Sequence, residues 1–302
     1  MTEEYNGVIV IDKPENISSA KVVSLLKSTL KIGKAGHTGT LDPNATGVLV
    51  CCLNQATRLA RFFLHGEKKY RAVLRLGVET DTQDSTGTVV AVNENVDFPK
   101  NVIRAVFEQF QGTLLQQPPV FSALKHNGTP LYKLARRGKP VLKPAREIFI
   151  SSIEVVEIGL PFIRFEVVCS GGTYIRALCS DIGTALGCGG HLHALRRLES
   201  SGFTEAEAIP LSEVGAVSRS DTLKDRMISM TDALRGMPEY VAGAALVDKL
   251  ICGKRLTEED FLHAPMGQTG GLIKIVDENN KLCAVLDVQE NIGHYKYCCV
   301  FR

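Results

Sequence analysis

A glycine-rich segment, residues 33–47 (GKAGHTGTLDPNATG), is the feature that most constrains how this chain folds. It holds four glycines, one proline and a single acidic residue, Asp42. Glycine and proline at this density interrupt helices and strands, so the segment is predicted to be a loop held by turn chemistry. The apolar run Val48–Leu53 follows directly and predicts a buried strand.

The residues before this loop predict a strand and then a helix. Gly7–Lys13 is an apolar run that ends in charge and Pro14, which is typical of a buried strand. Ser18 or Ser19 can cap the helix, and Gly33 is expected to end it. The apolar residues of this helix share one face: Val22, Leu25, Leu26 and Leu30.

The rest of the chain mixes strands and helices. Lys68–Gly77 alternates between apolar and charged residues, as a half-buried strand does. The segment 112–146 is rich in glycine, proline and basic residues and is predicted to be an insertion with at most one short helix. The strands Glu147–Ile158 and Phe162–Ser170 are predicted to pair as a hairpin around the turn Gly159-Leu160-Pro161. The other predicted elements are the helices 97–110 and Tyr174–Leu186 and a small β-rich domain over 237–302.

The composition excludes several classes of protein. The chain has 302 residues, of which 44% are hydrophobic and 23% charged, so it can bury a core and form two domains. Its longest strongly apolar run, Val48–Leu53, is far too short to cross a membrane. The sequence starts with polar and acidic residues, which predicts no secretory signal. Nine cysteines without a CxxC pair predict free thiols in a reducing compartment, and we therefore expect a cytoplasmic protein.

Positive charge is concentrated in the first two thirds of the chain. Residues 1–198 contain 24 Lys and Arg against 17 Asp and Glu, a net charge of +7. Residues 199–302 contain 11 against 16, a net charge of −5. The richest stretch, Lys125–Arg146, has seven basic residues and no acidic one. It can bind a polyanion or form an ordinary solvated face, and composition favours neither interpretation.

Motifs of several enzyme classes are absent from the sequence. The phosphate-loop pattern GxxxxGK[ST], the H-x-E and P-C-x-x-C pair of zinc deaminases and the G-x-S-x-G nucleophile elbow do not occur. The spaced glycines of the loop precede a strand and do not open a helix, unlike a dinucleotide fingerprint. Cys188, His191 and His193 are close in sequence, but no second cluster completes a metal site.

Asp42 is the only carboxylate in the loop, and no other acidic residue lies within twenty positions of it. The residues alone allow two interpretations. An aspartate before Pro43 can simply bond its own backbone in a turn, which is the commoner role. It can also be a catalytic carboxylate without a nearby acidic partner.

The octapeptide Gly36–Pro43 (GHTGTLDP), continued by Ala45–Gly47, resembles the motif of the TruB family of tRNA pseudouridine synthases. The resemblance runs from about residue 7 to 205, and the last 65 residues resemble the PUA-like appendage of bacterial members in size and strand content. Four further segments agree in order and spacing: Asp12-Lys13-Pro14 with Ser18-Ser19, Lys69–Ala72 with Thr80–Asp84, Gln117–Pro119 with Ser122–Lys125, and Gly172–Arg176 with Leu195–Arg197.

This resemblance implies the α+β pseudouridine-synthase fold, with a large mixed, mainly antiparallel sheet flanked by helices. Residues 1–236 would form the catalytic domain, and its basic insertion at about 112–146 would act as a thumb on RNA. Residues 237–302 would form a small β-rich, PUA-like RNA-binding domain.

The resemblance also implies the reaction. Uridine is isomerised to pseudouridine by breaking the bond from ribose C1′ to N1 and joining C1′ to C5, which needs no cofactor and no metal. Asp42 matches the family's catalytic nucleophile, and Arg176 matches the arginine that pairs with it. Tyr70 matches the residue that stacks on the target uracil. The remaining matches are Tyr174 and Leu195 in the base pocket, His37 in the space of the extruded nucleotides, and Lys13 beneath the loop or on the surface.

By the same resemblance the partner is the T-arm stem-loop of tRNA, modified at position 55 without a guide RNA, by a protein expected to be a monomer with no membrane contact. The basic insertion would track RNA phosphates. An alternative function is a tRNA-binding folding chaperone whose catalysis is secondary. The residues expected to contact RNA are Lys125, Lys133, Arg136, Arg137 and Lys139.

Overall fold

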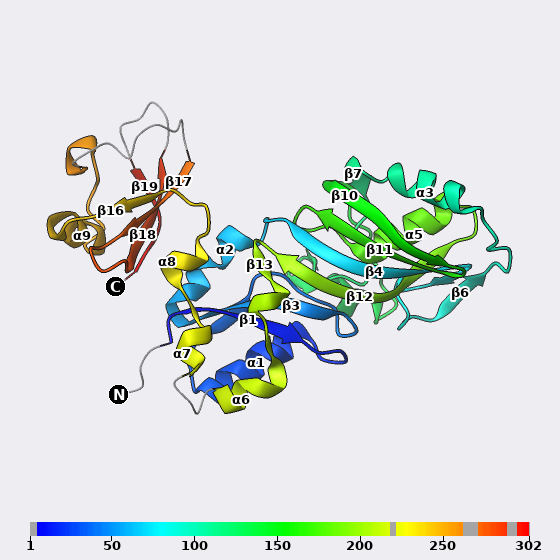
Figure 1. Cartoon of the computed structure of the whole chain (residues 1–302), viewed down its shortest axis with the longest axis horizontal. Helices are drawn as coiled ribbons and strands as arrows, with labels where there is room; N and C mark the ends of the chain where they lie inside the picture. Colours follow the sequence, from blue (N-terminus) through cyan, green and yellow to red (C-terminus); the bar gives the residue numbers. More distant parts are fainter. Residues whose placement is uncertain (1–4, 218–221, 262–270, 289–294, 302) are drawn as a thin grey trace.

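The computed structural model describes residues 5–217, 222–261, 271–288 and 295–301, and it contains one large sheet and one smaller sheet (Figure 1). The large sheet has eleven strands among the described residues, eight of them along the path β14-β1-β3-β12-β4-β11-β10-β7. Its neighbours are antiparallel except for the pairs β1–β14 and β3–β12. The expected mixed, mainly antiparallel α+β architecture is therefore confirmed. The strands on this path are β1 (Gly7–Lys13), β3 (Thr46–Leu53), β4 (Lys68–Leu76), β7 (Gly112–Gln116), β10 (Arg146–Gly159), β11 (Phe162–Cys169), β12 (Gly190–Ser200) and β14 (Ile209–Pro210).

Three short strands join the large sheet beside this path, and two small hairpins lie outside it. Short helices connect these elements. The short strands are β2 (Ala35–His37), β13 (Phe203–Thr204) and β15 (Ile228–Ser229), and the hairpins are β5 (Val78–Thr80) with β6 (Val89–Val92) and β8 (Lys125–His126) with β9 (Thr129–Pro130). The connecting helices are η1 (Asn54–Leu59), α2 (Ala60–Phe63), α4 (Leu131–Ala135), η2 (Glu205–Glu207), η3 (Leu211–Glu213), α6 (Val214–Val217), α7 (Thr222–Arg226), α8 (Met230–Ala233) and η4 (Glu258–Asp260).

One face of the large sheet is covered by three helices, which pack on it in two separate groups. Side chains alternate between the two faces of a strand, so residues two apart on one strand share a face. Helix α1 (Ser19–Leu30) packs on the β1 and β3 end of this face. Helices α3 (Lys100–Glu108) and α5 (Ile175–Ala185) pack on the β4 and β11 part. Figure 1 shows α1 and α5 well apart along the sheet, and the middle strands lie between them.

The other face of β1 and β3 packs against the C-terminal part of the chain. A separate four-stranded sheet has the order β16 (Glu239–Val241), β17 (Gly271–Val276), β18 (Leu282–Val288) and β19 (Tyr295–Val300), with helix α9 (Ala244–Ile251) against it. Val285 and Phe301 from this part belong to one buried cluster with Val10 and Val50 of the large sheet. The two sheets therefore share apolar core, and removing the smaller one would expose valines of the larger one.

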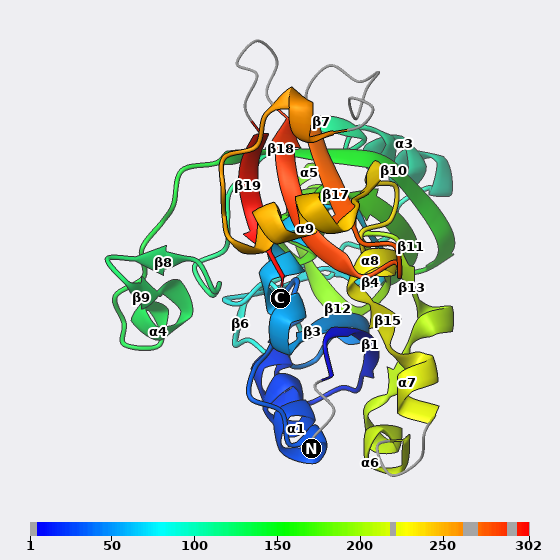
Figure 2. The same cartoon turned by 90° about the vertical axis from the view of Figure 1, so that its left-hand side faces the viewer.

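The structure corrects three local predictions. Helix α1 does not run to Gly33, because Lys31 takes the left-handed conformation (φ 52°) and its N–H bonds the carbonyl of Lys27. The loop 33–47 contains a short strand, β2, paired with β3. Residues 112–116 are not part of an insertion, since they form the edge strand β7 beside β10. The segment that leaves the sheet therefore begins after Gln116, and Figure 2 shows its β8, β9 and α4 projecting from the main body.

Most of the other predicted elements are confirmed. Strand β1 has the predicted bounds, and β10 with β11 forms the predicted hairpin. Along β4, Tyr70 and its apolar companions are buried while Arg71 is exposed, as the alternation predicts. All nine cysteines are free thiols, as the absence of paired spacing predicts.

Candidate active site

The loop that carries Asp42 returns to the sheet at Gly47, where only glycine fits. Gly47 has φ +97°, and a Cβ there would lie 2.2 Å from the carbonyl oxygen of Arg197 on the neighbouring strand β12. The loop is also tied to helix α1, because the Ser19 hydroxyl bonds both the N–H and the carbonyl of Leu41 at 2.8 Å. The amide of Ala45 donates to the Asp42 carbonyl at 3.1 Å. These contacts fix the backbone conformation of the loop.

Lys13 lies beneath the loop and is fully buried. Its ammonium donates to the carbonyls of Pro14 (2.8 Å), Ile17 (2.7 Å) and Pro43 (3.1 Å). Burial lowers the pKa of Lys13 from 10.5 to about 8, while the charge of Asp42 acts in the opposite direction. Of the two positions expected for Lys13, beneath the loop or on the surface, the structure has the one beneath the loop.

Asp42 pairs with Arg176 across the gap between the two groups of helices. The distance from Arg176 Nε to Asp42 Oδ2 is 2.9 Å. The arginine side chain is only 6% exposed, whereas the aspartate side chain is 37% exposed. A buried guanidinium orients the carboxylate, and the partly exposed carboxylate can still meet a substrate. The structure thus brings together two residues that the sequence places far apart.

Arg176 is itself held by the segment that follows β5. It donates to the carbonyl of Thr82 at 3.0 Å and to that of Phe121 at 2.9 Å. The buried Asp84 lies 3.7 Å from its Nε, and the hydroxyl and amide of Thr86 fix this second carboxylate. Asp84 is part of the segment Thr80–Asp84 that resembles the family, but the sequence predicts no role for it, because its arginine partner is remote in the chain.

Tyr70 and Leu195 lie on the neighbouring strands β4 and β12. Tyr70 belongs to the buried cluster that includes Leu41 of the loop 33–47, and Leu195 packs against this cluster. Burial raises the pKa of Tyr70, so the side chain is a neutral phenol at neutral pH. Tyr174 immediately precedes α5, and its backbone exchanges two hydrogen bonds with the Gln116 side chain.

His37 closes strand β2 at the start of the loop. Its Nδ1 is buried and has no hydrogen-bond partner in the structure. Burial lowers the pKa of His37, and the nearby charge of Arg197 lowers it further, so the ring is neutral. A neutral, unpartnered histidine beside a loop is available to an incoming ligand.

Arg197 is a buried residue of this site that sequence reasoning did not single out. It lies on β12 opposite Tyr70 and Gly47, and its side chain is only 1% exposed. Its Nε donates to the Val48 carbonyl at 2.7 Å, and its Nη2 donates to the Gly39 carbonyl at 3.0 Å. Strand alternation provides the signal that could have found it, since one of two adjacent arginines on a strand of a covered sheet must point inward.

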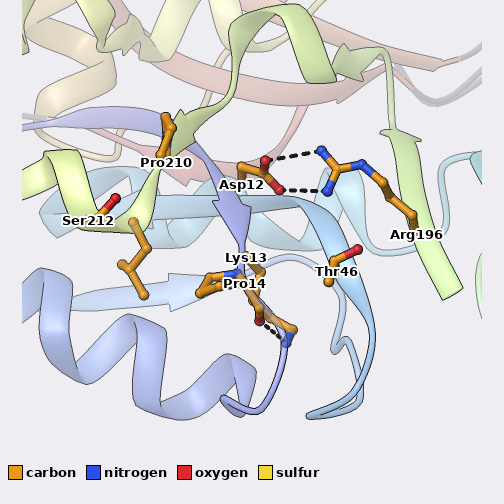
Figure 3. Close-up of a pocket in the computed structure, with 8 residues that line it drawn as sticks. Asp12, Lys13, Pro14, Thr46, Arg196, Pro210 and Ser212 are labelled. Carbon is orange, nitrogen blue, oxygen red and sulfur yellow. Dashed lines mark hydrogen bonds and ion pairs between the residues drawn. The ribbon is translucent and has the colours of Figure 1, made fainter. Parts of the chain in front are cut away.

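A cavity of about 230 Å³ lies beside the loop, and Figure 3 shows the residues that line it. Arg196 reaches across it to Asp12, with bonds of 3.1 and 3.0 Å, and also pairs with Glu205. Because the guanidinium is already shared by two carboxylates, this cavity has little net charge to offer a ligand. Its lining residues are Asp12, Lys13, Pro14, Thr46, Arg196, Pro210, Leu211 and Ser212.

The basic residues expected to contact RNA all lie on the projecting segment, and all are exposed. Among the described residues, no carboxylate forms an ion pair with any of them. The Phe121 carbonyl, which accepts a hydrogen bond from Arg176, belongs to the base of this same segment. These exposed residues are Lys125, Lys133, Arg136, Arg137 and Lys139.

Within the described ranges, no group of three or more His, Cys, Asp or Glu side chains gathers as metal ligands do. Cys188 is buried, His191 Nδ1 lies 2.7 Å from the Val78 carbonyl, and His193 packs on the Phe162 ring. Across the same ranges, the helices are too short or too polar to span a membrane.

Two family models match adjoining parts of the chain. The N-terminal domain of the TruB family pseudouridylate synthases matches residues 27–175, and the C-terminal domain of tRNA pseudouridylate synthase B matches residues 176–237. The chain therefore belongs to the TruB family of pseudouridine synthases, the enzymes that isomerise uridine in RNA.

Similar curated proteins and solved structures agree with this assignment. The tRNA pseudouridine synthase B of Alkaliphilus oremlandii is 39% identical over 295 residues, covering 93% of this chain and 97% of that protein. The same enzyme of Francisella tularensis subsp. novicida is 47% identical over 279 residues, covering 90% and 88%. A chain of an H/ACA RNP bound to a substrate RNA containing 2′-deoxyuridine aligns over 99% of this chain and 86% of its own, with 27% identity and a TM-score of 0.76.

Proposed function

We propose that this enzyme converts the uridine at position 55 in the T-arm of tRNA to pseudouridine, without a guide RNA and with Asp42 as the nucleophile. The observation that carries this proposal is the pairing of the half-exposed Asp42 with the buried Arg176 at 2.9 Å. It supplies one oriented and partly exposed carboxylate.

Asp42 would attack the uridine at the ribose or at the base, while the bond from C1′ to N1 breaks and its electron pair goes to the base. The base then turns, C5 bonds to C1′, and the hydrogen on C5 leaves as a proton while N1 gains one. No group is lost and no electron is transferred. The chain supplies a nucleophile, an arginine that orients it, and a pocket that holds the detached base.

The pocket for the base would form between Tyr70, Leu195 and Tyr174. A uridine within a structured stem-loop is stacked, so it must be extruded to reach Asp42. Tyr70 presents a neutral aromatic ring on the same face as the carboxylate, which suits stacking on uracil. His37 has an unpartnered buried nitrogen at the mouth of the loop and would contact the nucleotides beside the target.

The tRNA substrate is inferred from the names of the curated relatives and from the charge of the projecting segment. Five exposed basic residues on one projection would bind the phosphates of a folded stem-loop and recognise its shape. The small sheet over residues 239–300 would add RNA contacts as a PUA-like domain. The protein would act in the cytoplasm, where unmodified tRNA is available, with no cofactor.

A tritium-release assay tests this function. An unmodified tRNA transcript carrying [5-³H]uridine is mixed with the protein and no other RNA. We expect about one tritium released per tRNA, since C5 loses its hydrogen once. A matched transcript with cytidine at position 55 should release none. If neither transcript releases tritium but tRNA refolding is accelerated, the chaperone alternative replaces this proposal.

A further inference from the structure

Arg197 is a buried cation that the mechanism above does not use. None of the ion pairs found among the described residues includes it. Burying a guanidinium without a counter-ion is costly, and an apolar residue of similar size would often be at least as stable there. Its donors go to two backbone carbonyls, those of Val48 and Gly39. A cation kept at this cost inside an active site suggests a functional role.

Tyr70 faces Arg197 across the β12–β4 pair. Burial raises the pKa of Tyr70, whereas the nearby charge of Arg197 acts to lower it. The same guanidinium donates to the Gly39 carbonyl of the loop that carries Asp42. Arg197 therefore bonds that loop and faces Tyr70 from the neighbouring strand.

We propose that Arg197 is a positioning residue for the reaction, which holds the Tyr70 phenol beside the substrate site and fixes the Gly39 carbonyl of the loop that carries Asp42. This inference rests on the proposed function, because it takes Tyr70 to face the target uracil. Arg197 is on the protein side of the loop and fully buried, so it cannot touch RNA. Its replacement should therefore slow the change of bonds at the base and leave tRNA binding intact.

The adjacent Arg196 provides a matched control. It is on the same strand, but it points to the opposite face of the sheet and is 36% exposed. It pairs with Asp12 and Glu205 and touches neither Tyr70 nor the Gly39 carbonyl by any bond found here. The same substitution at the two positions separates a general effect of removing a guanidinium from an effect on the site.

The kinetic test measures the single-turnover rate constant at saturating tRNA and the Kd for tRNA. Arg197→Lys keeps the charge but loses the planar fork, and we expect a rate about 100-fold lower with a Kd within about twofold of wild type. Arg196→Lys should stay within about threefold in both. A rate for Arg197→Lys equal to that of Arg196→Lys would overturn the proposal, and so would a loss confined to Kd.

A spectroscopic test does not depend on activity, so it stays informative if the proposed function fails. The seven tyrosines are labelled with ¹³C at Cζ, and Tyr70 is assigned by its loss in Tyr70→Phe. We expect Arg197→Lys to shift the Tyr70 resonance and to leave the other six in place, while Arg196→Lys shifts none of the seven. An unmoved Tyr70 resonance would overturn the proposal. If Arg197→Lys does not fold, Tyr70→Phe takes its place in the kinetic test. A wild-type rate for Tyr70→Phe would then overturn the proposal.

Discussion

The loop 33–47, which carries Asp42, and the projecting segment 117–145 both involve charged residues that matter to the proposed function, but the two regions hold them in opposite ways. At the loop, the two charges of the candidate site are fixed: Lys13 bonds three carbonyls and Asp42 bonds Arg176. In the projecting segment the five basic side chains named above are exposed and have no carboxylate partner within the described part of the chain.

This difference separates two kinds of electrostatic function. Buried charges with fixed partners act on one substrate atom at short range, and salt screens them little. Exposed charges attract a polyanion over a longer range and are strongly screened. Arg176 on α5 links the two regions, because it pairs with Asp42 and donates to the carbonyl of Phe121 at the base of the projecting segment. We therefore expect substitutions in the loop to abolish turnover and substitutions in the segment to weaken binding.

The largest effect is expected for Asp42→Asn. The amide keeps the shape of the side chain but is neither charged nor nucleophilic, so no pseudouridine should form. Binding of tRNA should stay within about tenfold of wild type, or 1.4 kcal/mol. Filter binding and product analysis of the same protein sample check both halves, and turnover near the wild-type level would remove Asp42 from the mechanism.

Arg176→Lys should give the next largest effect. Lysine keeps a positive charge but cannot reach Asp42, Thr82 and Phe121 together, since it lacks the planar fork. We expect the single-turnover rate to fall by about 100-fold or more. The exposed Arg164, which pairs only with Glu157 on the surface, provides a control substitution. Equal rates for the two lysine variants would contradict a structured pair at the active site.

Replacing Lys133, Arg136, Arg137 and Lys139 with glutamine should act on binding alone. Each phosphate contact contributes roughly −0.7 to −0.9 to the log–log slope of affinity against salt, so the slope should flatten by up to about three. Stability should barely change, since exposed charges contribute little.

The matched control for these four positions replaces exposed lysines around helix α1: Lys21, Lys27, Lys31 and Lys34. A salt titration of tRNA binding compares the proteins. If the segment variant keeps the wild-type slope, the projecting segment does not bind phosphates.

The smallest effect concerns the pH dependence that Lys13 adds to stability. Its pKa in the folded protein is about 8, below the unfolded value of 10.5, so between these values the unfolded chain binds more protons. Wild type should therefore gain stability relative to Lys13→Met as the pH rises from 8 to 10, by about 1 to 3 kcal/mol. Below pH 8 the difference between the two proteins should be flat. Urea unfolding across this range measures it, and parallel curves throughout would contradict the shifted pKa.

The sequence predicted local structure well where the pattern is local. Alternation along β4 identified the buried face of Tyr70, and turn residues located the hairpin of β10 and β11. The sequence-based prediction failed where tertiary contacts determine the secondary structure. Strand β7 lies in a stretch with turn composition, and its pairing with β10 makes it a strand. The left-handed Lys31 gives no sequence signal, because helix ends of this kind usually carry glycine.

The candidate site shows the same division. Asp42 was found because a rigid glycine loop marks it, and the family motif added Arg176. The roles of Asp84 and Arg197 could not be predicted, since each depends on a partner brought near by the fold: Arg176 for the first, Tyr70 and Gly39 for the second. A buried charge becomes informative only when its partners are known.

The central claim is that Asp42 drives isomerisation at a single uridine of tRNA, and mapping the modified position tests it most directly. Wild type and Asp42→Asn are each incubated with an unmodified tRNA transcript and no other RNA. Pseudouridine is then located by carbodiimide-induced stops in reverse transcription. The account predicts one strong stop, assigned to position 55, with wild type and none with the variant. A stop at a different uridine, or an equal stop with Asp42→Asn, would contradict it.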